Sequence, residues 1–431
     1  MNIDNEHLPK GWKLKFVSDI GDVKGGKRVP IGHSLLNEKT NHPYLSVKDL
    51  KNNSVKDDQI RYLSHETWSK IKNYTISHED VYFTIAGTIG DVGQIPQKWS
   101  GSNLTENACK ICNLNGITKN YLYNVLQSNY VQNQIKEKIS RVGVSKFGLY
   151  KVRDLKIPAP PLKEQRKIAS ILSNVDALIS YYDASIESTK KLKKGLMQQL
   201  LTKGIGHKKF KKIKWLFGKE IEIPEEWTMI PISQTKIKII DGDRGDEYPK
   251  ESDFSTNGHF CLFLSTKNVT KKGFEFNECS FITKEKDEKL RKGKLTKKDL
   301  VITTRGTIGN IAFYDDTIPF DEIRINSGMA ILRNNDEKIY NKFLYNFLKS
   351  EFVKKQIQSV KFGSAQPQLT LGTINSLKLI IPQKIEQEKI ASILSNIDSQ
   401  IQSQIQYKEK LERLKKSLMQ KLLTGQIRVK V

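Results

Sequence analysis

The chain has 431 residues, of which 37% are hydrophobic and 28% are charged, a composition that excludes wholesale disorder and allows two or three domains. No apolar run is long enough to span a membrane, and residues 1–10 lack the apolar core of a signal peptide, so we expect a cytoplasmic protein. The chain carries 72 Lys and Arg against 47 Asp and Glu, a net charge of +25, which indicates a polyanionic partner such as nucleic acid. A lysine-rich surface that binds nothing is the alternative.

The first half of the chain is predicted to form a β-rich body that ends in a short helix. Pro-Lys-Gly-Trp at 9–12 opens a series of short β-type runs over about residues 12–115, broken by Gly, Asn and Asp. The sequence Gly-Thr-Ile-Gly at 87–90 is expected to be a tight turn between two of these strands. A helix near 119–140 then closes the body.

A second, much longer helix is predicted over 164–201 from apolar residues at helical spacing, about 38 residues and roughly 57 Å in length. Pro160 and Pro161 mark its entry, and Gly204 follows its last leucines, where a helix stop is expected. Its apolar seam is narrow, which favours packing against another helix, although burial against its own body is the alternative. The seam begins with Ile168, Ile171, Leu172 and Val175.

The second half of the chain repeats the first in the same order. EQRKIASILSNVD at 164–176 returns as EQEKIASILSNID at 386–398, with eleven of thirteen residues identical and a shift of 222. Pro-Glu-Glu-Trp lies at 224–227 and a second Gly-Thr-Ile-Gly at 306–309, ahead of a second long helix predicted over 386–423. A duplication of this size determines the architecture, and the two long helices are natural partners. The second seam includes Ile390, Ile393, Leu394 and Ile397.

These motifs resemble those of the DNA specificity (S) subunits of type I restriction–modification systems, over the whole chain. The most specific are IPAPPLKEQRKIASIL at 157–172 and IIPQKIEQEKIASIL at 380–394, each with a β-type body before it. The resemblance implies an α+β fold: two β-rich target-recognition domains separated by two long, mutually packed, coiled-coil-like helices, in a pseudo-two-fold internal repeat. The implied target-recognition domains are 1–162 and 206–384, and the implied spacer helices are 163–205 and 385–431.

The same resemblance implies a subunit that binds double-stranded DNA and is not itself an enzyme. Each target-recognition domain would read one half of a split DNA sequence, while the helices set the gap and dock two methyltransferase (M) subunits. Restriction (R) subunits would join this complex. S-adenosylmethionine, ATP and Mg would serve those partner subunits, so that this chain would hold no cofactor and no metal.

The residues themselves offer no catalytic motif. We find no Asn-Pro-Pro-Tyr-type methylase motif, no phosphate-binding loop and no His-Glu-x-x-His. Cys109 and Cys112 form an isolated CxxC, which predicts a reduced strand rather than a zinc site, and Asp-Glu-Ile-Arg at 321–324 is expected to be a surface turn. Two other functions stay open: a non-specific nucleic-acid-binding coiled-coil scaffold, and an enzyme with unrecognised methylase or nuclease motifs.

Positions that differ between the two copies are the candidates for reading bases. Aligning Pro30 with Pro249 sets a loop with three basic residues against a loop in which one arginine lies among three acidic residues. Arg and Lys suit guanine whereas carboxylates accept from cytosine, so two unlike half-sites are predicted, with solvated loops as the alternative. Arg305 replaces Ala86 before the Gly-Thr-Ile-Gly turn, and a polar loop follows the shorter helix in each copy. The DNA-binding candidates are Lys24, Lys27, Arg28, Lys146, Arg244, Arg305, Gln366 and Gln368.

Overall fold

The structure of the protein is a computed structural model that describes residues 8–51, 53–140, 146–255, 260–360 and 368–430. The chain forms two compact units, which we call unit 1 and unit 2. Unit 1 comprises Met1–Ala184 and Ile405–Val431, and unit 2 comprises Ser185–Gln404.

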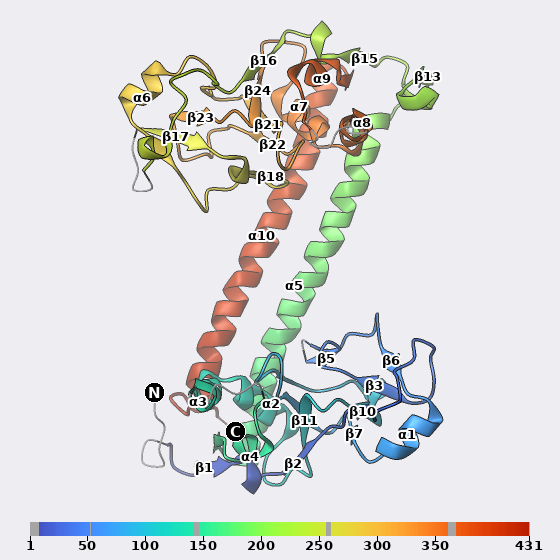
Figure 1. Cartoon of the computed structure of the whole chain (residues 1–431), viewed down its shortest axis with the longest axis vertical. Coiled ribbons are helices and arrows are strands. Elements are labelled where there is room, and N and C mark those ends of the chain that lie inside the picture. The colour runs from blue at the N-terminus through green and yellow to red at the C-terminus, as the bar shows by residue number, and fades with distance from the viewer. Residues whose placement is uncertain (1–7, 52, 141–145, 256–259, 361–367, 431) are drawn as a thin grey trace. The chain divides into compact units, whose positions relative to one another are not determined.

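Two long helices each contribute one half to each unit. They are α5 (Leu162–Lys203) and α10 (Lys384–Leu423), and a β-rich body supplies the rest of each unit (Figure 1). Both helices match the predicted ranges to within two residues. Gly204 and Gly425 follow them with φ of +70° and +76°, the left-handed conformation that ends a helix at glycine, which confirms the first of these as the predicted stop.

Unit 1 contains two four-stranded sheets and two smaller strand pairs. Its strands are β1 (Lys13–Phe16), β2 (Asp22–Gly25), β3 (Pro43–Leu45), β4 (Leu50–Lys51), β5 (Ser54–Val55), β6 (Arg61–Tyr62), β7 (Thr75–Ile76), β8 (Val81–Thr84), β9 (Val92–Gly93), β10 (Ser102–Leu104), β11 (Ala108–Cys112) and β12 (Lys156–Ala159). The sheets have the orders β2-β11-β8-β9 and β6-β3-β10-β7, while β1 pairs with β12 and β4 with β5. Its helices besides α5 and α10 are α1 (His65–Ile71), α2 (Lys119–Gln127), α3 (Asn129–Ser140) and α4 (Leu149–Arg153).

Unit 2 repeats this plan with different loops. Its strands are β13 (Phe210–Lys214), β14 (Glu220–Pro224), β15 (Thr228–Pro231), β16 (Ile237–Asp241), β17 (Cys261–Leu264), β18 (Val269–Thr270), β19 (Gly273–Phe274), β20 (Phe281–Ile282), β21 (Leu300–Thr303), β22 (Ile311–Phe313), β23 (Ile323–Ile325), β24 (Met329–Asn334) and β25 (Lys378–Ile381). The order β16-β24-β21-β22 matches the first sheet of unit 1, and the pair β15–β25 matches β1–β12. Its shorter helices are α6 (Lys284–Lys289), α7 (Asn341–Leu348), α8 (Glu351–Val360) and α9 (Leu371–Ser376).

The Gly-Thr-Ile-Gly turns are built in the same way in both units. Gly87 and Gly90 have φ of +76° and +94°, and Gly306 and Gly309 have φ of +67° and +85°, values that a side chain would strain. The hydroxyl of Thr84 accepts the N–H of Asp91 at 2.9 Å and also bonds within the turn, as Thr303 does in unit 2. The predicted tight strand reversals are confirmed.

The isolated CxxC lies on β11, a strand with neighbours on both sides. Cys109 and Cys112 are buried free thiols, which confirms the predicted reduced strand. Burial raises the pKa of the Cys109 thiol to about 12, so this sulfur is held in the unreactive thiol form.

Each long helix begins with a Glu-Gln pair that ties it to the body of its unit. In unit 1 the indole N–H of Trp12 donates to Glu164 at 3.2 Å, and Arg428 pairs with the same carboxylate. The side chain of Gln165 is fully buried. It accepts from the backbone N–H of Thr118 at 2.8 Å and donates to two backbone carbonyls, Gly116 and Pro160.

Unit 2 has the same arrangement. The indole of Trp227 donates to Glu386 at 2.9 Å, and Gln387 accepts from the N–H of Tyr340 at 2.8 Å while donating to the carbonyls of Lys338 and Pro382. The Pro-x-x-Trp and Glu-Gln motifs therefore recur together because they form the two sides of one joint between body and helix.

The predicted seam residues are buried by the body as well as by the other helix. Ile168 and Leu172 are fully buried in the core of unit 1, which also holds Leu422 and Leu423 of α10. In unit 2 the core surrounds Ile390, Ile393 and Leu394 together with Leu200 and Leu201 of α5. Val175 and Ile397 are 8% and 9% exposed, and Ile171 packs partly buried beside the first cluster.

The halves of α5 and α10 also pack against each other within each unit. In unit 1, Lys415 pairs with Asp176 at 2.6 Å, and the rings of Tyr182 and Tyr407 lie 4.9 Å apart. In unit 2, Lys193 pairs with Asp398 at 2.5 Å. The predicted α+β class with mutually packed long helices is confirmed.

Candidate nucleic-acid interface

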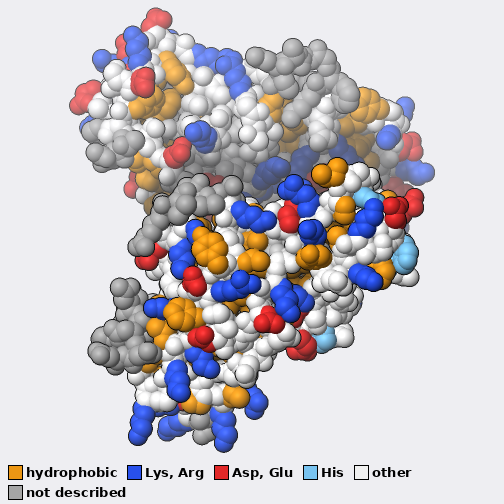
Figure 2. Space-filling view, turned by 60° about the horizontal axis from the view of Figure 1, so that its bottom comes forward, with side chains coloured by type: hydrophobic (Ala, Val, Ile, Leu, Met, Phe, Trp, Pro, Cys, Tyr) orange, Lys and Arg blue, Asp and Glu red, His pale blue; other side chains and the backbone are white. Residues whose placement is uncertain are grey.

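On the face shown in Figure 2, basic side chains are spread out rather than gathered in one patch. They lie among hydrophobic side chains, with fewer acidic ones between them. Such a surface suits a ligand whose phosphates are spread along its length and whose bases offer apolar edges. The candidate residues must therefore be located one loop at a time.

Strand pairing shows which positions of the two units correspond. Thr84 and Thr303 end equivalent strands and make equivalent bonds, and they face Ala108 and Met329. One pair further along, Cys109 faces Gly25 and Ala330 faces Asp241. The residues after β2 and β16 therefore correspond at a shift of 216, not at the 219 given by aligning the two prolines, and that alignment is wrong by three residues.

With the correct register, Arg28 corresponds to Arg244. The Nε of Arg28 donates to Glu106 at 2.7 Å, while its side chain is 78% exposed. Arg244 pairs with Asp241 at 3.2 Å and donates to the carbonyl of Ser327, the position that corresponds to Glu106. Each unit thus holds one arginine at the same place, anchored at one side and open to solvent. Opposite chemistry was predicted at this site, and that prediction is wrong for the arginine.

The neighbouring position does differ in charge. Lys27 is exposed, with its Nζ 5.5 Å from the centre of the Tyr74 ring, whereas the corresponding Asp243 is buried. Asp243 accepts from the backbone N–H groups of Gly245, Arg291 and Lys292. Burial alone would raise the pKa of Asp243, but these bonds outweigh it and lower the pKa below 3.8. This carboxylate holds its own loop and is not free to accept from cytosine.

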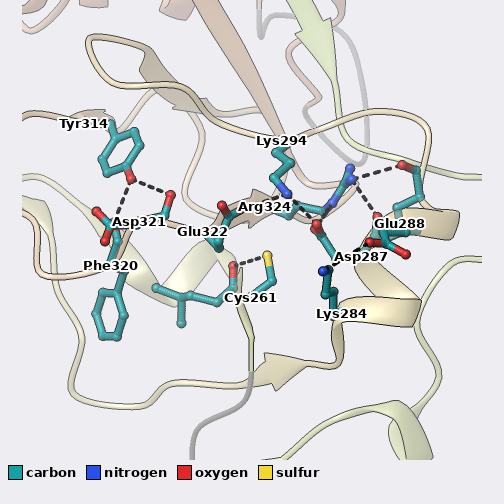
Figure 3. Close-up of polar contacts among 12 residues, drawn as sticks. Cys261, Lys284, Asp287, Glu288, Lys294, Tyr314, Phe320, Asp321, Glu322 and Arg324 are labelled. Carbon is teal, nitrogen blue, oxygen red and sulfur yellow. Dashed lines mark hydrogen bonds and ion pairs between the residues drawn. The ribbon is translucent and has the colours of Figure 1, made fainter.

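A buried ionic cluster holds the segment at 291–292 to which Asp243 is bonded. Asp287 on α6 binds Lys294 and, at 2.5 Å, the Nε of Arg324 (Figure 3). The Nη1 of Arg324 donates to the carbonyl of Lys292 at 2.7 Å. Arg324 lies on strand β23 and is 5% exposed. The expectation of a surface turn at 321–324 is therefore confirmed for Asp321 and Glu322, which form a bend, and wrong for Ile323 and Arg324. The acidic residue that neutralises Arg324 is distant in sequence, so the pattern of the tetrapeptide could not show its burial.

The remaining candidates fall into two groups. Lys24 lies on β2, the strand that leads into the arginine loop, and pairs with Asp22 at 3.3 Å. Arg305 lies against Gln368. When the amide of Gln368 is oriented to satisfy both groups, its oxygen accepts from the guanidinium of Arg305 at 3.2 Å. At the corresponding place in unit 1, Lys146 forms a β-bridge with Ala86. Lys146 and Gln368 therefore each lie against the residue that precedes the Gly-Thr-Ile-Gly turn of their unit, while Gln366 lies outside the described residues.

Unit 1 also has an open groove of about 1300 Å³ that sequence reasoning missed. Tyr44 lines the groove and donates to the carbonyl of Lys27 at 2.9 Å, so one wall of the groove is continuous with the arginine loop. Burial raises the pKa of Tyr44 to about 12, which keeps its hydroxyl a donor. The basic residues that line the groove are Lys39, Lys48, Lys51, Lys56 and Arg61. Of these, Lys39, Lys48 and Lys51 form no ion pair with any described residue.

A repeated turn could have identified one of these lysines. Ser46 donates its N–H to Asp49 at 2.8 Å, and Ser265 donates to Asn268 at 2.9 Å, in the matching stretches YLSVKD and FLSTKN. A lysine precedes the acceptor in both. The match is short and lies between anchors that otherwise hardly agree, so it was not recognised in the sequence.

Unit 2 has a hollow of about 590 Å³ whose lining carries charges of both signs. Its wall includes Asp315, Asp316, Asp336 and Glu337 together with Lys298, Lys342 and Lys384. Within the described parts of the chain, no group of three or more His, Cys, Asp or Glu is placed to hold a metal ion. No described helix is long and apolar enough to cross a membrane.

Comparisons with known proteins agree over nearly the whole chain. The sequence profile of the family described as "Type I restriction modification DNA specificity domain" matches residues 9–194 and 224–413, one match for each repeat. The type I restriction enzyme MjaVIII specificity subunit of Methanocaldococcus jannaschii is 29% identical over 444 residues, covering 98% of this chain and 94% of the relative. The EcoBI specificity subunit of Escherichia coli is 22% identical, covering 91% and 81%.

Solved structures share the fold. A crystal structure of the type I restriction–modification S subunit from M. genitalium aligns with a TM-score of 0.55 and 16% identity, covering 98% of both chains. A chain from a structure of a type I restriction–modification system, described in terms of complex assembly and conformational transition, aligns with a TM-score of 0.59, covering 97% of this chain and 99% of that one.

Proposed function

We propose how this chain divides its work between bodies and helices, from the premise that it belongs to the type I restriction–modification DNA specificity family. It is a specificity subunit, with two copies of the domain that recognises DNA sequence. Each β-rich body reads one half of a two-part target, and the two long helices set the distance between the halves. The observation that carries this proposal is the pair of equivalent, solvent-facing arginines Arg28 and Arg244, one in each unit.

The arginines suit direct reading of bases. The Nε of Arg28 donates to Glu106, which fixes the guanidinium while the side chain stays 78% exposed. Two N–H groups in a plane match the O6 and N7 atoms of guanine in the major groove. Arg305 with Gln368 in unit 2, and Lys146 in unit 1, supply a second, unlike set of donors and acceptors.

The helices have a different task in this proposal. Two methyltransferase subunits dock on the paired helices, whose repeated sequence offers each of them an equivalent surface, and restriction subunits join that assembly. The chain itself is not an enzyme. S-adenosylmethionine, ATP and Mg serve the partner subunits. The missing catalytic motifs support this view, as does the use of the buried Glu, Gln and Asp side chains in structural bonds.

Mapping of adenine methylation tests the proposal. Arg28→Ala and Arg244→Ala are introduced separately, each complex is assembled with its methyltransferase partner, and methylated sites are read by single-molecule sequencing. We expect each variant to relax one base position in a different half-site, at a cost of about 1–3 kcal/mol per lost contact. Each variant serves as the experimental control for the other. Equal binding of specific and scrambled duplexes by the unaltered complex would instead favour a non-specific scaffold.

A further inference from the structure

Ile31 is the most exposed large hydrophobic residue among those described, at 102% of its reference accessibility. It lies in the loop that carries Lys27 and Arg28, between Pro30 and Gly32. A fully exposed side chain adds no buried apolar area to the fold, so that of Ile31 stays available for a contact outside it.

The backbone holds Ile31 at the corner of a tight turn. The N–H of His33 donates to the carbonyl of Pro30 at 3.1 Å, which closes a four-residue turn. Gly32 occupies its third position with φ of +84°, the value that a type II turn requires of that residue. No atom lies within 4 Å of the place where a Cβ on Gly32 would stand, so the tip projects freely.

Both ends of the loop are anchored, which makes this tip rigid. Val29 and Leu35 pack against the buried cluster of Tyr44, Leu63 and Ile71. The ring of His33 bonds the hydroxyl of Thr67 on α1 at 2.9 Å. An apolar side chain presented in this way loses little conformational freedom when it is covered, and this favours a binding role.

The surroundings of the tip indicate what covers it. Arg28, which pairs with Glu106 and is 78% exposed, precedes the turn. Lys70, which also pairs with Glu66 at 3.4 Å, donates at 2.7 Å to His33 at the end of the turn. Cations around a single apolar group complement the phosphates and the one methyl group that the major groove of DNA presents, on thymine. We propose that Ile31 contacts a thymine methyl group in the half-site read by unit 1.

Comparison with unit 2 favours DNA over a partner protein as the occupant. The residues that follow Arg244 are Gly245, Asp246 and Glu247, and the carboxylate of Glu247 pairs with Lys286 at 3.5 Å. A surface that docks a partner subunit present in two copies should recur in both repeats. A residue present in one repeat alone suits a contact that distinguishes the two half-sites. This inference rests on the proposed function.

The test removes the methyl group from the DNA and the side chain from the protein separately. The target is mapped first, and the half-site read by unit 1 is the one that Arg28→Ala relaxes. Each thymine in that half-site is then replaced in turn by uracil, which lacks only the 5-methyl group. Affinities are measured by competition with the complete complex. At one thymine we expect the unaltered complex to lose about fivefold in affinity.

Ile31→Ala should bind the thymine duplex about fivefold or more weakly and no longer distinguish uracil from thymine at that position. Ile427→Ala, which shortens another exposed isoleucine of unit 1, should keep both the affinity and the distinction. The inference is overturned if Ile31→Ala keeps the thymine preference, if it weakens all duplexes equally, or if that half-site contains no thymine on either strand. Failure of the unaltered complex to distinguish specific from scrambled DNA would overturn the proposed function itself.

Discussion

Asp287 shows how a single buried carboxylate can support a loop that the sequence marks only as variable. Its side chain is 2% exposed, and it neutralises Arg324, which is 6% exposed at the side chain. Arg324 in turn holds the carbonyl of Lys292, whose N–H binds Asp243 in the arginine loop. The chain of contacts therefore connects the interior of unit 2 to the site of Arg244.

Replacing Asp287 by Asn should destabilise unit 2 strongly. The amide cannot neutralise Arg324, and leaving a buried charge without its partner costs about 3–5 kcal/mol. Hydrogen exchange of strand β23 in the full-length protein measures this as faster opening. Glu288→Gln, at the next position of the same helix, is the control, because Glu288 is 65% exposed and pairs only loosely with Lys284 at 3.9 Å. Equal exchange in the two variants would contradict the structural role of the cluster.

The same pair gives a pH dependence with a definite sign. Burial by itself raises the pKa of Asp287, but hydrogen bonds from Lys294 and Arg324 outweigh it, so that the folded pKa lies below 3.8. A carboxyl whose pKa is lowered by folding stabilises the protein fully above its unfolded pKa, and this stabilisation is lost as the pH falls through the folded value. The difference between the parent and Asp287→Asn should therefore be constant from pH 6 to 8 and shrink below about pH 4.

At the scale of the element, the joint between body and helix explains why a Glu-Gln pair recurs at the start of both long helices. The buried glutamine uses both ends of its amide, and it satisfies three backbone groups from two segments that would otherwise lie unpaired at the start of a long helix. The tryptophan of Pro-x-x-Trp reaches the adjacent glutamate in both units. Neither the glutamine nor the glutamate keeps an unbonded polar side-chain atom that could bind a ligand.

Gln387→Leu should loosen this joint. The substitution leaves the N–H of Tyr340 and two carbonyls unpaired in a buried site, which costs on the order of 3 kcal/mol. Thermal unfolding of the full-length chain should show the loss. Glu388→Leu, one residue further on and exposed, should change stability little. Similar behaviour of the two variants would mean that the repeated motif serves another purpose.

The sequence predicted elements better than it predicted positions within loops. The ranges of the two long helices, the Gly-Thr-Ile-Gly turns and the cysteine strand follow from local spacing and agree with the structure. The single helix predicted near 119–140 is wrong, because the chain is extended at Ser128 and forms two helices, α2 and α3. The correspondence of Arg28 with Arg244 does not follow from local spacing, because it depends on which residues face each other across β2–β11 and β16–β24. The loops differ in length just before their prolines, so matching letters gave a register three residues out. The groove of unit 1 was missed because its lysines come from several short segments.

At the scale of the whole molecule, the repeat is visible in the ion pairs between the helices. Asp176 with Lys415 in unit 1 and Asp398 with Lys193 in unit 2 are the same pair, since both partners shift by 222 residues. Each helix thus supplies the aspartate in one unit and the lysine in the other. Such a pair of antiparallel helices keeps its contacts only if both helices have matching lengths.

Matched insertions test whether helix length sets the gap between half-sites. Four residues are added after Ala184 in α5 and four after Gln404 in α10, where unit 1 and unit 2 meet in the chain. Each helix lengthens by about 6 Å and rotates by a little over one turn, so the seam is only mildly disturbed. Because duplex DNA advances roughly 3.4 Å per base pair, we expect a gap that is one or two base pairs longer, with both half-site sequences unchanged.

Two controls make this result specific to length. Two residues in each helix rotate the seam by roughly 200°, which should prevent packing and abolish methylation. Four residues in α5 alone leave α10 too short, so that pairs such as Lys193 with Asp398 cannot form together with those of unit 1. Adenine-methylation maps of the three variants and the parent give the gap directly. If the matched variant is active and keeps the parental gap, the helices join the recognition domains but their length does not determine the distance between half-sites.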